Sequence, residues 1–407
     1  MKRFSIILLG ALAILMAGCS KDVHTASKEP ASDDWLVNLE LPVPIEFGSG
    51  SIQTKASFKD MDDLLTVDGG TKHSFGVYAI DKATSTIEQE DLLLDNHRAY
   101  YLENTDGSKS FTLVQKGSTG INPDPQYYPM VSEKSYDFYG YYARKGDSEI
   151  TGIGSTQIMV NVPVGSSKDD ILWAKASTGM SGNEYNDGYN ARYIRKNPDG
   201  KPVLNFKHVT SCLKFKAIYA PNEGETEPDM SEIKITALKI KSIPTQAQLC
   251  VIDVAEPANA SQLFPTGDAT DVDINGALAY QANLITSKDN DTGAYIATDL
   301  CDDFFIAPQD EALEVQFTIK YTPAGGTAAK SQTVTYTLDP SQLGADENDD
   351  GKIEDNNGNV IRLFEAGYQY GFSLKVYSPE EISIDVTLDS YKNAFSGDDG
   401  FADIVIE

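Results

Sequence analysis

The first residue of this chain that could carry chemistry is a cysteine near its N-terminus. Cys19 follows Ala17 and Gly18, which end an apolar run, residues 4–16, that comes directly after two basic residues. Basic residues, a short apolar region and small residues before the cut are the order of a secretion signal, and the run is too short to span a bilayer. A cysteine directly after the small residues is typical of a bacterial lipobox, in which the thiol is acylated and becomes the new N-terminus. We therefore expect a lipid at Cys19 as the only membrane anchor.

A peptide bond open to proteolysis is the second candidate. Lys55 precedes the small residue Ala56 inside GSGSIQTKAS, a stretch rich in Gly and Ser that we expect to be a flexible tether. A trypsin-like protease would find this basic residue accessible. Taken alone, the stretch is better explained as an ordinary loop after a first strand. The interpretation therefore depends on the elements around it.

Oxygen ligands for a cation occur in DENDDGKIEDNN. Asp346, Asn348 and Asp350 lie at alternate positions before Gly351, as in the first half of a calcium loop. Asn357 occupies the twelfth position, where a bidentate glutamate is expected, and the flanking residues indicate strands rather than the helices of an EF-hand. A solvated acidic turn is the simpler interpretation. Weak calcium binding is left open, and no other cofactor is expected.

Catalytic motifs are missing from the sequence. It contains no HExxH, GxSxG, P-loop or paired-cysteine zinc spacing, and its four histidines are scattered. His208, which precedes the strand-like LKFKAIY, is interpreted as structural. Carboxylate pairs for sugar chemistry are left open because acidic residues are abundant. We expect that the protein is not an enzyme.

The net charge argues against one class of partner, and the cysteine content argues against one class of fold. The chain of 407 residues has 61 acidic and 33 basic side chains, a net charge of −28, which repels phosphate backbones and argues against nucleic-acid partners. Beyond Cys19 there are three cysteines, Cys212, Cys250 and Cys301, and an odd number cannot all pair within one chain. We expect no disulfide framework.

The element that precedes Lys55 is an extended strand with one buried face. Pro42 and Pro44 both lie on even positions, so one edge of this strand loses two amide donors while the other edge can still pair. The odd positions are all apolar, which is the period of a strand and of no helix. These are Trp35, Val37, Leu39, Leu41, Val43, Ile45 and Phe47. The strand is suited to removal, which would leave an apolar groove.

The rest of the chain consists of short alternating runs separated by turn residues, and helical periodicity is nearly absent. This pattern favours antiparallel β-sandwiches or barrels. Alternation lapses at residues 175–201 and then resumes, which indicates a domain boundary. The aromatic stretch from Tyr127 to Tyr142 alternates between two faces, so core packing explains about half of it, and a sugar-stacking platform is the alternative.

Several segments together resemble the fimbrillin family, the subunits of type V pili. They are the lipobox at Cys19, the one-sided early strand, YYP…YDFYGYY, DILWA from Asp170, LNFKHVTSCLKFKA from Leu204 and FEAGYQYGFSLKV from Phe364. The resemblance implies an all-β protein with two transthyretin-like antiparallel β-sandwich domains. We place the signal peptide and lipobox at residues 1–19, the tether and removable strand at 20–55, and the two domains at 56–203 and 204–407.

The resemblance also implies a mechanism. A lipoprotein precursor would reach the outer membrane and cell surface, and a trypsin-like protease would cut after Lys55, where arginine is typical of the family. The exposed groove would then accept an extended segment of another copy or of a related pilus subunit, by β-strand addition. Two segments near the C-terminus alternate suitably for this donor role. One has Ile382, Ile384, Val386 and Leu388, and the other has Phe401, Ile404 and Ile406.

These implications lead to a structural stalk or tip subunit of a fimbria that supports adhesion. Two alternatives are left open. One is a surface glycan-binding lipoprotein that does not polymerise and uses the tyrosine-rich stretch as its platform. The other is a fimbrial anchor subunit that keeps its lipid.

Overall fold

The computed structural model describes residues 41–48, 51–53, 65, 67–68, 71–103, 105, 107–114, 121, 123–130, 134–144, 148–151, 153–178, 188–221, 230–274, 282–338, 364–378 and 381–390. The chain divides into two compact units, Met1–Pro42 and Val43–Glu407, and the sheets belong to the second. Some residues singled out by the sequence lie outside the described ranges. These are Cys19, Trp35, Val37, Leu39, Lys55, Ala56, Asp346, Asn348, Asp350, Phe401, Ile404 and Ile406.

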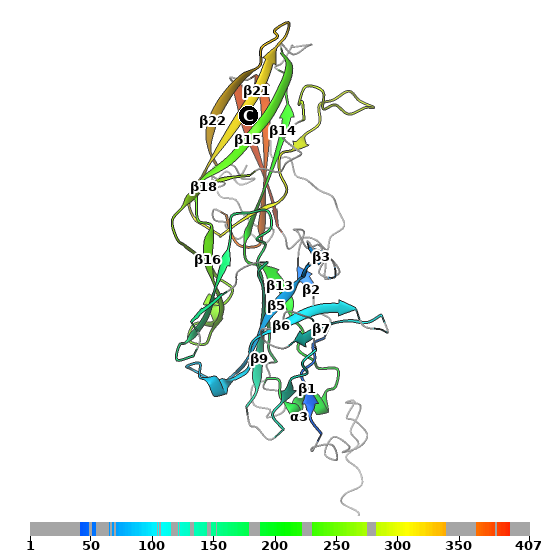
Figure 1. The fold of residues 1–407 in the computed structure, drawn as a ribbon, viewed down its shortest axis with the longest axis vertical. Helices are drawn as coiled ribbons and strands as arrows, with labels where there is room; N and C mark the ends of the chain where they lie inside the picture. Colours follow the sequence, from blue (N-terminus) through cyan, green and yellow to red (C-terminus); the bar gives the residue numbers. More distant parts are fainter. Residues whose placement is uncertain are drawn as a thin grey trace, which may run out of the picture. The chain divides into compact units, whose positions relative to one another are not determined.

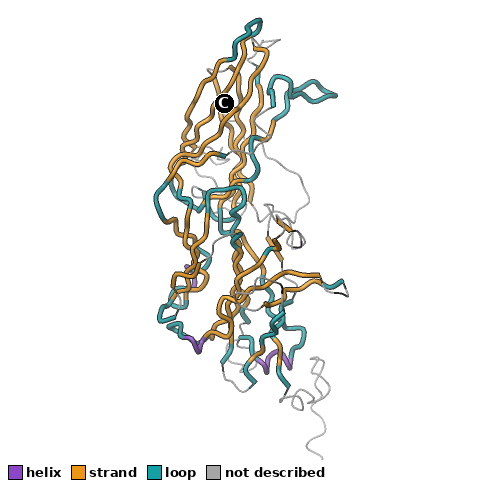
Figure 2. The backbone as a smooth tube through the Cα atoms, viewed as in Figure 1, coloured by secondary structure: helices purple, strands orange, loops and turns teal. Residues whose placement is uncertain are grey.

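Strands make up most of the described chain (Figure 2). Helical residues in this part are limited to α3 (Ala191–Lys196), two single 3₁₀ turns, η2 (Gln89–Asp91) and η3 (Pro257–Asn259), and the 3₁₀ residue Leu65. Asn190 caps α3, because its side chain accepts a hydrogen bond from the Tyr193 amide at 2.8 Å. The expected all-β class with several antiparallel sheets is confirmed. No helix among these residues is long and apolar enough to cross a bilayer.

A seven-stranded sheet forms the centre of the N-terminal part (Figure 1). Its order is β2 (Ser51–Gln53), β13 (Asn205–His208), β12 (Leu172–Ala176), β9 (Tyr136–Tyr142), β5 (Ser74–Asp81), β6 (Leu92–Glu103) and β7 (Lys109–Val114). All neighbours are antiparallel except β2 and β13, which run parallel. Two short strands, β3 (Val67–Asp68) and β4 (Thr71–Lys72), pair with each other and with no other described strand.

Both faces of β9, the central strand of this sheet, are buried. Every residue of β9 is buried, with Tyr136 and Phe138 in one apolar cluster and Tyr139 and Tyr141 in another. The cluster with Tyr139 is shared with a four-stranded sheet of β10 (Ser148–Thr151), β11 (Gln157–Pro163), β16 (Gln246–Asp253) and β17 (Leu263–Thr266). The YDFYGYY part of the aromatic stretch is therefore core, and it offers no sugar platform.

A second pair of sheets forms the C-terminal part. One contains β19 (Thr298–Asp299), β14 (Ser211–Tyr219), β23 (Tyr368–Ser378) and β24 (Glu381–Ser390), with β20 (Phe304–Ile306) also pairing with β14. The other contains β18 (Thr270–Asp273), β15 (Met230–Ile243), β21 (Leu313–Pro323) and β22 (Lys330–Leu338). Phe215, Phe317 and Phe372 meet in the core between them. The alternation of LKFKAIY is confirmed, because its odd-numbered residues are buried and Lys214 and Lys216 are partly exposed.

Sheet membership does not follow chain order. β15 belongs to the C-terminal sheets, and its continuation β16 pairs with β11 in the N-terminal part. β14 pairs in parallel with β23, from Cys212 opposite Gln369 to Tyr219 opposite Val376. The division of the chain at residues 203 and 204 therefore stays a prediction.

Candidate functional site: the seat of the first strand

The described end of the early strand packs onto the seven-stranded sheet. β1 (Val43–Pro44) begins it, and Val43, Ile45 and Phe47 are 6%, 6% and 4% exposed. Pro44 and Glu46 between them are exposed. Alternation thus holds from Val43 to Phe47. All three are buried in one apolar cluster, and we call six other members of this cluster the strand seat: Phe75, Phe111, Tyr128, Phe138, Leu204 and Phe206.

Aromatic rings form the centre of the strand seat. The Phe47 ring lies edge-on to Phe138, with centroids 5.7 Å apart, and to Phe111, with centroids 6.2 Å apart. Phe138 comes from β9 and Phe111 from β7. Edge-to-face contacts of this kind add about 0.5–1.5 kcal/mol beyond the area that the rings bury. Phe47 is therefore the anchor of the first strand.

The first strand forms its backbone hydrogen bonds along the edge where no proline removes an N–H. β1 is antiparallel to β8 (Tyr127–Tyr128), with Val43 opposite Tyr128. The Ile45 amide donates to the Gln126 carbonyl oxygen at 2.7 Å. Pro44 lacks an N–H, so its position on the other edge costs no hydrogen bond in this pair. The strand pairs through its odd-numbered residues, as its proline pattern predicts.

Beyond Phe47 the chain passes close to a second segment. The Gly48 amide donates to the Pro202 carbonyl oxygen at 2.9 Å. A Cβ at Gly48 would lie 2.9 Å from Val203 Cγ2, so a larger residue would clash. On the outer side, Lys201 Nζ and Glu46 Oε2 are 2.7 Å apart. Glu46 is exposed and Lys201 is partly exposed, so this ion pair contributes at most about 1 kcal/mol.

The helix α3 completes the surroundings of β1. Ala191 of α3 is buried in the same cluster as Phe47, and Tyr193 and Ile194 pack against it. Figure 1 shows α3 beside β1. Sequence reasoning did not find this helix, because one short helix in a polar stretch gives little periodic signal.

A strand occupies the middle of the expected tether. Residues Ser51–Gln53 form β2, which pairs in parallel with β13. In this register Ser51 lies opposite Asn205, Ile52 opposite Phe206 and Gln53 opposite Lys207. The prediction of a plain flexible tether before Lys55 is therefore wrong for these residues. Three residues between glycine-rich neighbours are too few to give a periodic signal.

One polar atom is buried without a partner in the strand seat. The Tyr128 hydroxyl has no hydrogen-bond partner among the described residues, and the residue is 2% exposed. Burial, followed by the nearby Tyr189 and Tyr193, raises the pKa of Tyr128 well above its ordinary value. The hydroxyl therefore stays neutral, and its lost hydration costs stability.

One of the two candidate donor segments is part of a sheet here. Residues Ile382 to Leu388 belong to β24, which runs antiparallel to β23, with Ile382 opposite Val376 and Leu388 opposite Tyr370. β24 has no other neighbour in its sheet among the described strands. Within its own chain this segment is thus an edge strand.

The structural interpretation of His208 fits its surroundings. Its Nδ1 lies 2.6 Å from Asp170 Oδ1, and both side chains are almost fully buried. Thr210 Oγ1 also donates to Asp170 Oδ1, at 3.3 Å. This pair fixes the point where β13 leads into β14.

The cysteines in the described part form no disulfide. Cys212, Cys250 and Cys301 all keep their thiols, and the first two are buried. Burial raises the pKa of Cys250 and of Cys301 to about 12 in each case. A raised pKa leaves less of the nucleophilic thiolate at neutral pH.

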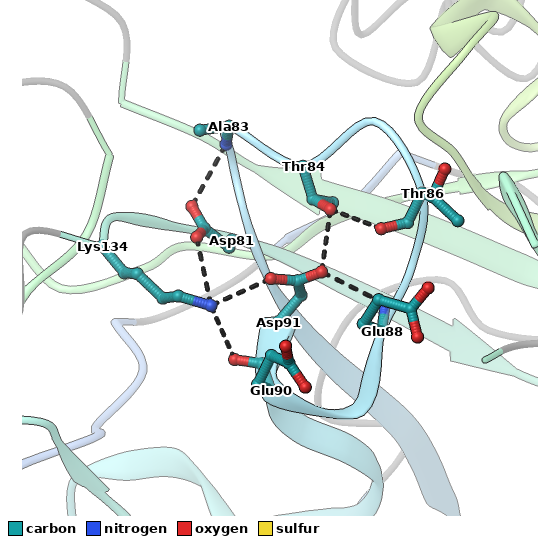
Figure 3. Close-up of polar contacts among 8 residues, drawn as sticks. All are labelled: Asp81, Ala83, Thr84, Thr86, Glu88, Glu90, Asp91 and Lys134. Atoms are coloured by element: carbon teal, nitrogen blue, oxygen red, sulfur yellow. Dashed lines mark hydrogen bonds and ion pairs between the residues drawn. The ribbon is translucent and has the colours of Figure 1, made fainter. Parts of the chain in front are cut away.

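A polar cluster that the sequence analysis missed holds the connection between β5 and β6 (Figure 3). Lys134 Nζ donates to the Glu90 carbonyl oxygen at 2.8 Å and to Asp91 Oδ1 at 2.9 Å, and it lies 3.5 Å from Asp81 Oδ2. Thr84 Oγ1 donates to the other oxygen, Asp91 Oδ2, at 2.8 Å. Through Lys134, the cluster ties this loop to the segment before β9.

The same contacts determine the charge of this cluster. Burial raises the pKa of Asp91, but hydrogen bonds from Lys134, Thr84 and the Glu88 amide outweigh burial and leave the pKa below its ordinary value. The hydrogen bond to Asp91 raises the pKa of Lys134. Elsewhere too, the described residues include no group of three or more His, Cys, Asp or Glu placed to hold a metal ion.

Comparison with known proteins identifies a family by sequence. A sequence profile of the fimbrillin-like family matches residues 66–390, a region that begins after β1 and β2. A search of curated proteins found no match.

Solved structures that resemble the chain are distant in sequence. A candidate cell adhesion protein of Bacteroides uniformis is 14% identical, with 86% of this chain and 98% of that chain covered and a TM-score of 0.44. The tip fimbrial protein Mfa3 of Porphyromonas gingivalis is 7% identical, with 86% and 99% covered and a TM-score of 0.33. The fimbrial anchor protein Mfa2 of Porphyromonas gingivalis is 10% identical, with 86% and 98% covered and a TM-score of 0.33.

The profile match covers most of the chain and agrees with the family that the sequence motifs resemble. The chain therefore belongs to the fimbrillin-like family of fimbrial and cell-surface adhesion proteins, which are structural and not enzymes.

Proposed function

We propose that the protein is a stalk or tip subunit of a type V fimbria that supports adhesion. It is exported as a lipoprotein acylated at Cys19, cut after Lys55 and assembled by β-strand addition. The observation that carries this proposal is the strand seat, where Val43, Ile45 and Phe47 fill the apolar core of the chain to which they belong. A short segment that completes a core is the element that strand exchange replaces.

The free energy of burial at the strand seat favours replacement of the first strand by a strand of another subunit over loss of the first strand without replacement. Burial of Val43, Ile45 and Phe47 contributes about 1.5–3 kcal/mol per side chain, or roughly 5–9 kcal/mol together. An apolar surface of this kind left in water favours association. An extended segment of another subunit with apolar residues at alternate positions would recover most of this free energy, less the cost of ordering.

The position of the cut follows from the sequence. Lys55 is the only basic residue between Lys28 and Lys59, and it follows the whole early strand. Cleavage there removes β1 and β2 together and leaves the family-matched region from residue 66 intact. The processing protease and the outer membrane, through the lipid of the precursor, are thus partners before assembly.

The pairing of β24 favours one donor candidate over the other. Residues Ile382 to Leu388 already pair with β23 along its length, so their departure would open a sheet of the same chain. The segment with Phe401, Ile404 and Ile406 follows β24 in the chain. We therefore assign the donor role to residues 401–406, which would reach the strand seat of a second subunit.

Controlled proteolysis tests the proposal. The purified precursor is treated with a low dose of trypsin, and its products are followed by mass spectrometry and by gels run without boiling. A fragment that begins at Ala56 should appear first, followed by ladders of associated subunits. The Lys55→Ala variant should stay monomeric, and a chain shortened before Phe401 should be cut but not associate. Equal association of Lys55→Ala and the parent would refute the mechanism.

A further inference from the structure

The strand β2 lies directly upstream of the proposed cleavage site. Its last residue, Gln53, is two positions before Lys55. We propose that the pairing of β2 with β13 is a latch that controls processing, so that the bond after Lys55 is cut only when β2 has left β13. This inference rests on the proposed cleavage after Lys55 and adds its regulation.

The reason is the way in which proteases hold their substrates. An endoprotease encloses an extended stretch of several residues on both sides of the bond that it cuts. Ser51, Ile52 and Gln53 are the fifth, fourth and third residues counted back from the cut, with Lys55 as the first. These residues are held against the seven-stranded sheet by a backbone ladder to Asn205, Phe206 and Lys207. Bound in this way, they cannot enter a protease cleft.

The latch depends on the strand seat. Phe206, opposite Ile52, is buried in the same cluster as Phe47. Its neighbours Asn205 and Lys207 are exposed, so β13 presents its apolar residue to the core that β1 completes. Detachment of β2 is therefore expected to accompany loosening of the first strand.

Because of this coupling, cleavage after Lys55 takes place in subunits from which β2 has already detached. When opening and closing are fast, the rate of cleavage follows the population of the open form. A subunit in which β1 and β2 are seated is then cut slowly. A subunit that is cut has already released β2, so cleavage and departure of the strand become one event.

A reversible lock tests the latch directly. Ser51 and Asn205 are opposite each other and Asn205 is exposed, so Ser51→Cys with Asn205→Cys, in a Cys19→Ser background, places a disulfide outside the core. Trypsin is added to the oxidised and the reduced protein, the reaction is stopped and reduced, and the fragment that begins at Ala56 is quantified. Oxidation should slow this cut at least about tenfold, and reduction should restore it. The two single-cysteine variants should show no redox effect.

A second pair of variants weakens the latch. Adjacent amides in a strand point to opposite sides, so one of Ser51→Pro and Ile52→Pro removes a donor to β13, and the other removes one directed away. One of the two variants should be cut several-fold faster than the other. A cleavage rate unchanged by the lock, or by both prolines, overturns the latch. If the lock slows the cut but cut subunits never associate, the latch stands and the proposed function fails.

Discussion

Phe47 of the first strand lies edge-on to Phe138 of β9, with ring centroids 5.7 Å apart and an angle of 88° between the rings. Phe138 belongs to the central strand of the seven-stranded sheet and is fully buried. A segment proposed to leave the protein thus contacts the centre of the core. Removal of this segment is expected to lower the free energy of unfolding and to expose apolar surface.

Replacement of Phe47 by alanine tests this contact. Loss of a buried phenylalanine typically lowers the free energy of unfolding by about 3–5 kcal/mol, and we expect a loss in this range for the uncut protein. Urea denaturation measures it. Leu41→Ala is the control, because Leu41 is 60% exposed and its loss should cost no more than about 0.5 kcal/mol. Equal effects of the two substitutions would contradict the role of Phe47 as anchor.

The close approach at Gly48 makes a second prediction. Gly48→Ala places a Cβ 2.9 Å from Val203 Cγ2 and should destabilise the uncut protein by about 1–3 kcal/mol. Val203→Ala removes the obstructing methyl group. The double variant should therefore recover part of the loss, and a double-mutant cycle from urea denaturation measures the coupling. Strictly additive effects would show that the two residues do not touch.

The unpartnered hydroxyl of Tyr128 predicts a gain in stability. Tyr128→Phe removes a buried polar group that has no hydrogen-bond partner, and it should raise the free energy of unfolding by about 1 kcal/mol or more. Tyr141→Phe is the matched control, because the Tyr141 hydroxyl donates to Asn96 Oδ1 at 3.0 Å. That variant should lose about 1 kcal/mol. A loss of stability in Tyr128→Phe would mean that this hydroxyl has a partner.

The cluster around Lys134 predicts a dependence on pH. The pKa of Asp91 is lowered in the folded chain, so its contribution to stability is present above the ordinary aspartate value of about 4 and is lost as the pH falls through the lowered value. Lys134→Met should reduce the difference in unfolding free energy between pH 7 and pH 3. Because Lys134 is about one-third exposed, with a side-chain exposure of 35%, the change should be about 1 kcal/mol or less. An unchanged difference would remove Lys134 as the cause.

Periodicity and proline chemistry account for what the sequence could predict of the site. Alternation identified Val43, Ile45 and Phe47 as the buried face, because a strand over a core repeats every two residues. Pro44 identified the edge that does not pair. In the same way, alternation divided the tyrosines of β9 between two faces.

The rest of the site depends on contacts between distant segments. Gln126 and Pro202 receive the first strand through backbone carbonyls, which carry no side-chain signal. Lys134 and Asp91 are 43 residues apart and meet only because two connections end at the same place. β15 runs on into β16, which pairs in another sheet, and no local pattern marks this change.

The first residue of the protein in assembled fimbriae tests the central claim most directly. Fimbriae sheared from intact cells and dissociated in hot detergent would be digested and analysed for N-terminal peptides by mass spectrometry. The account predicts a chain that begins at Ala56, without the lipid and without Trp35 to Phe47. Assembled subunits that begin at an acylated Cys19 and retain residues 20–55 would contradict it.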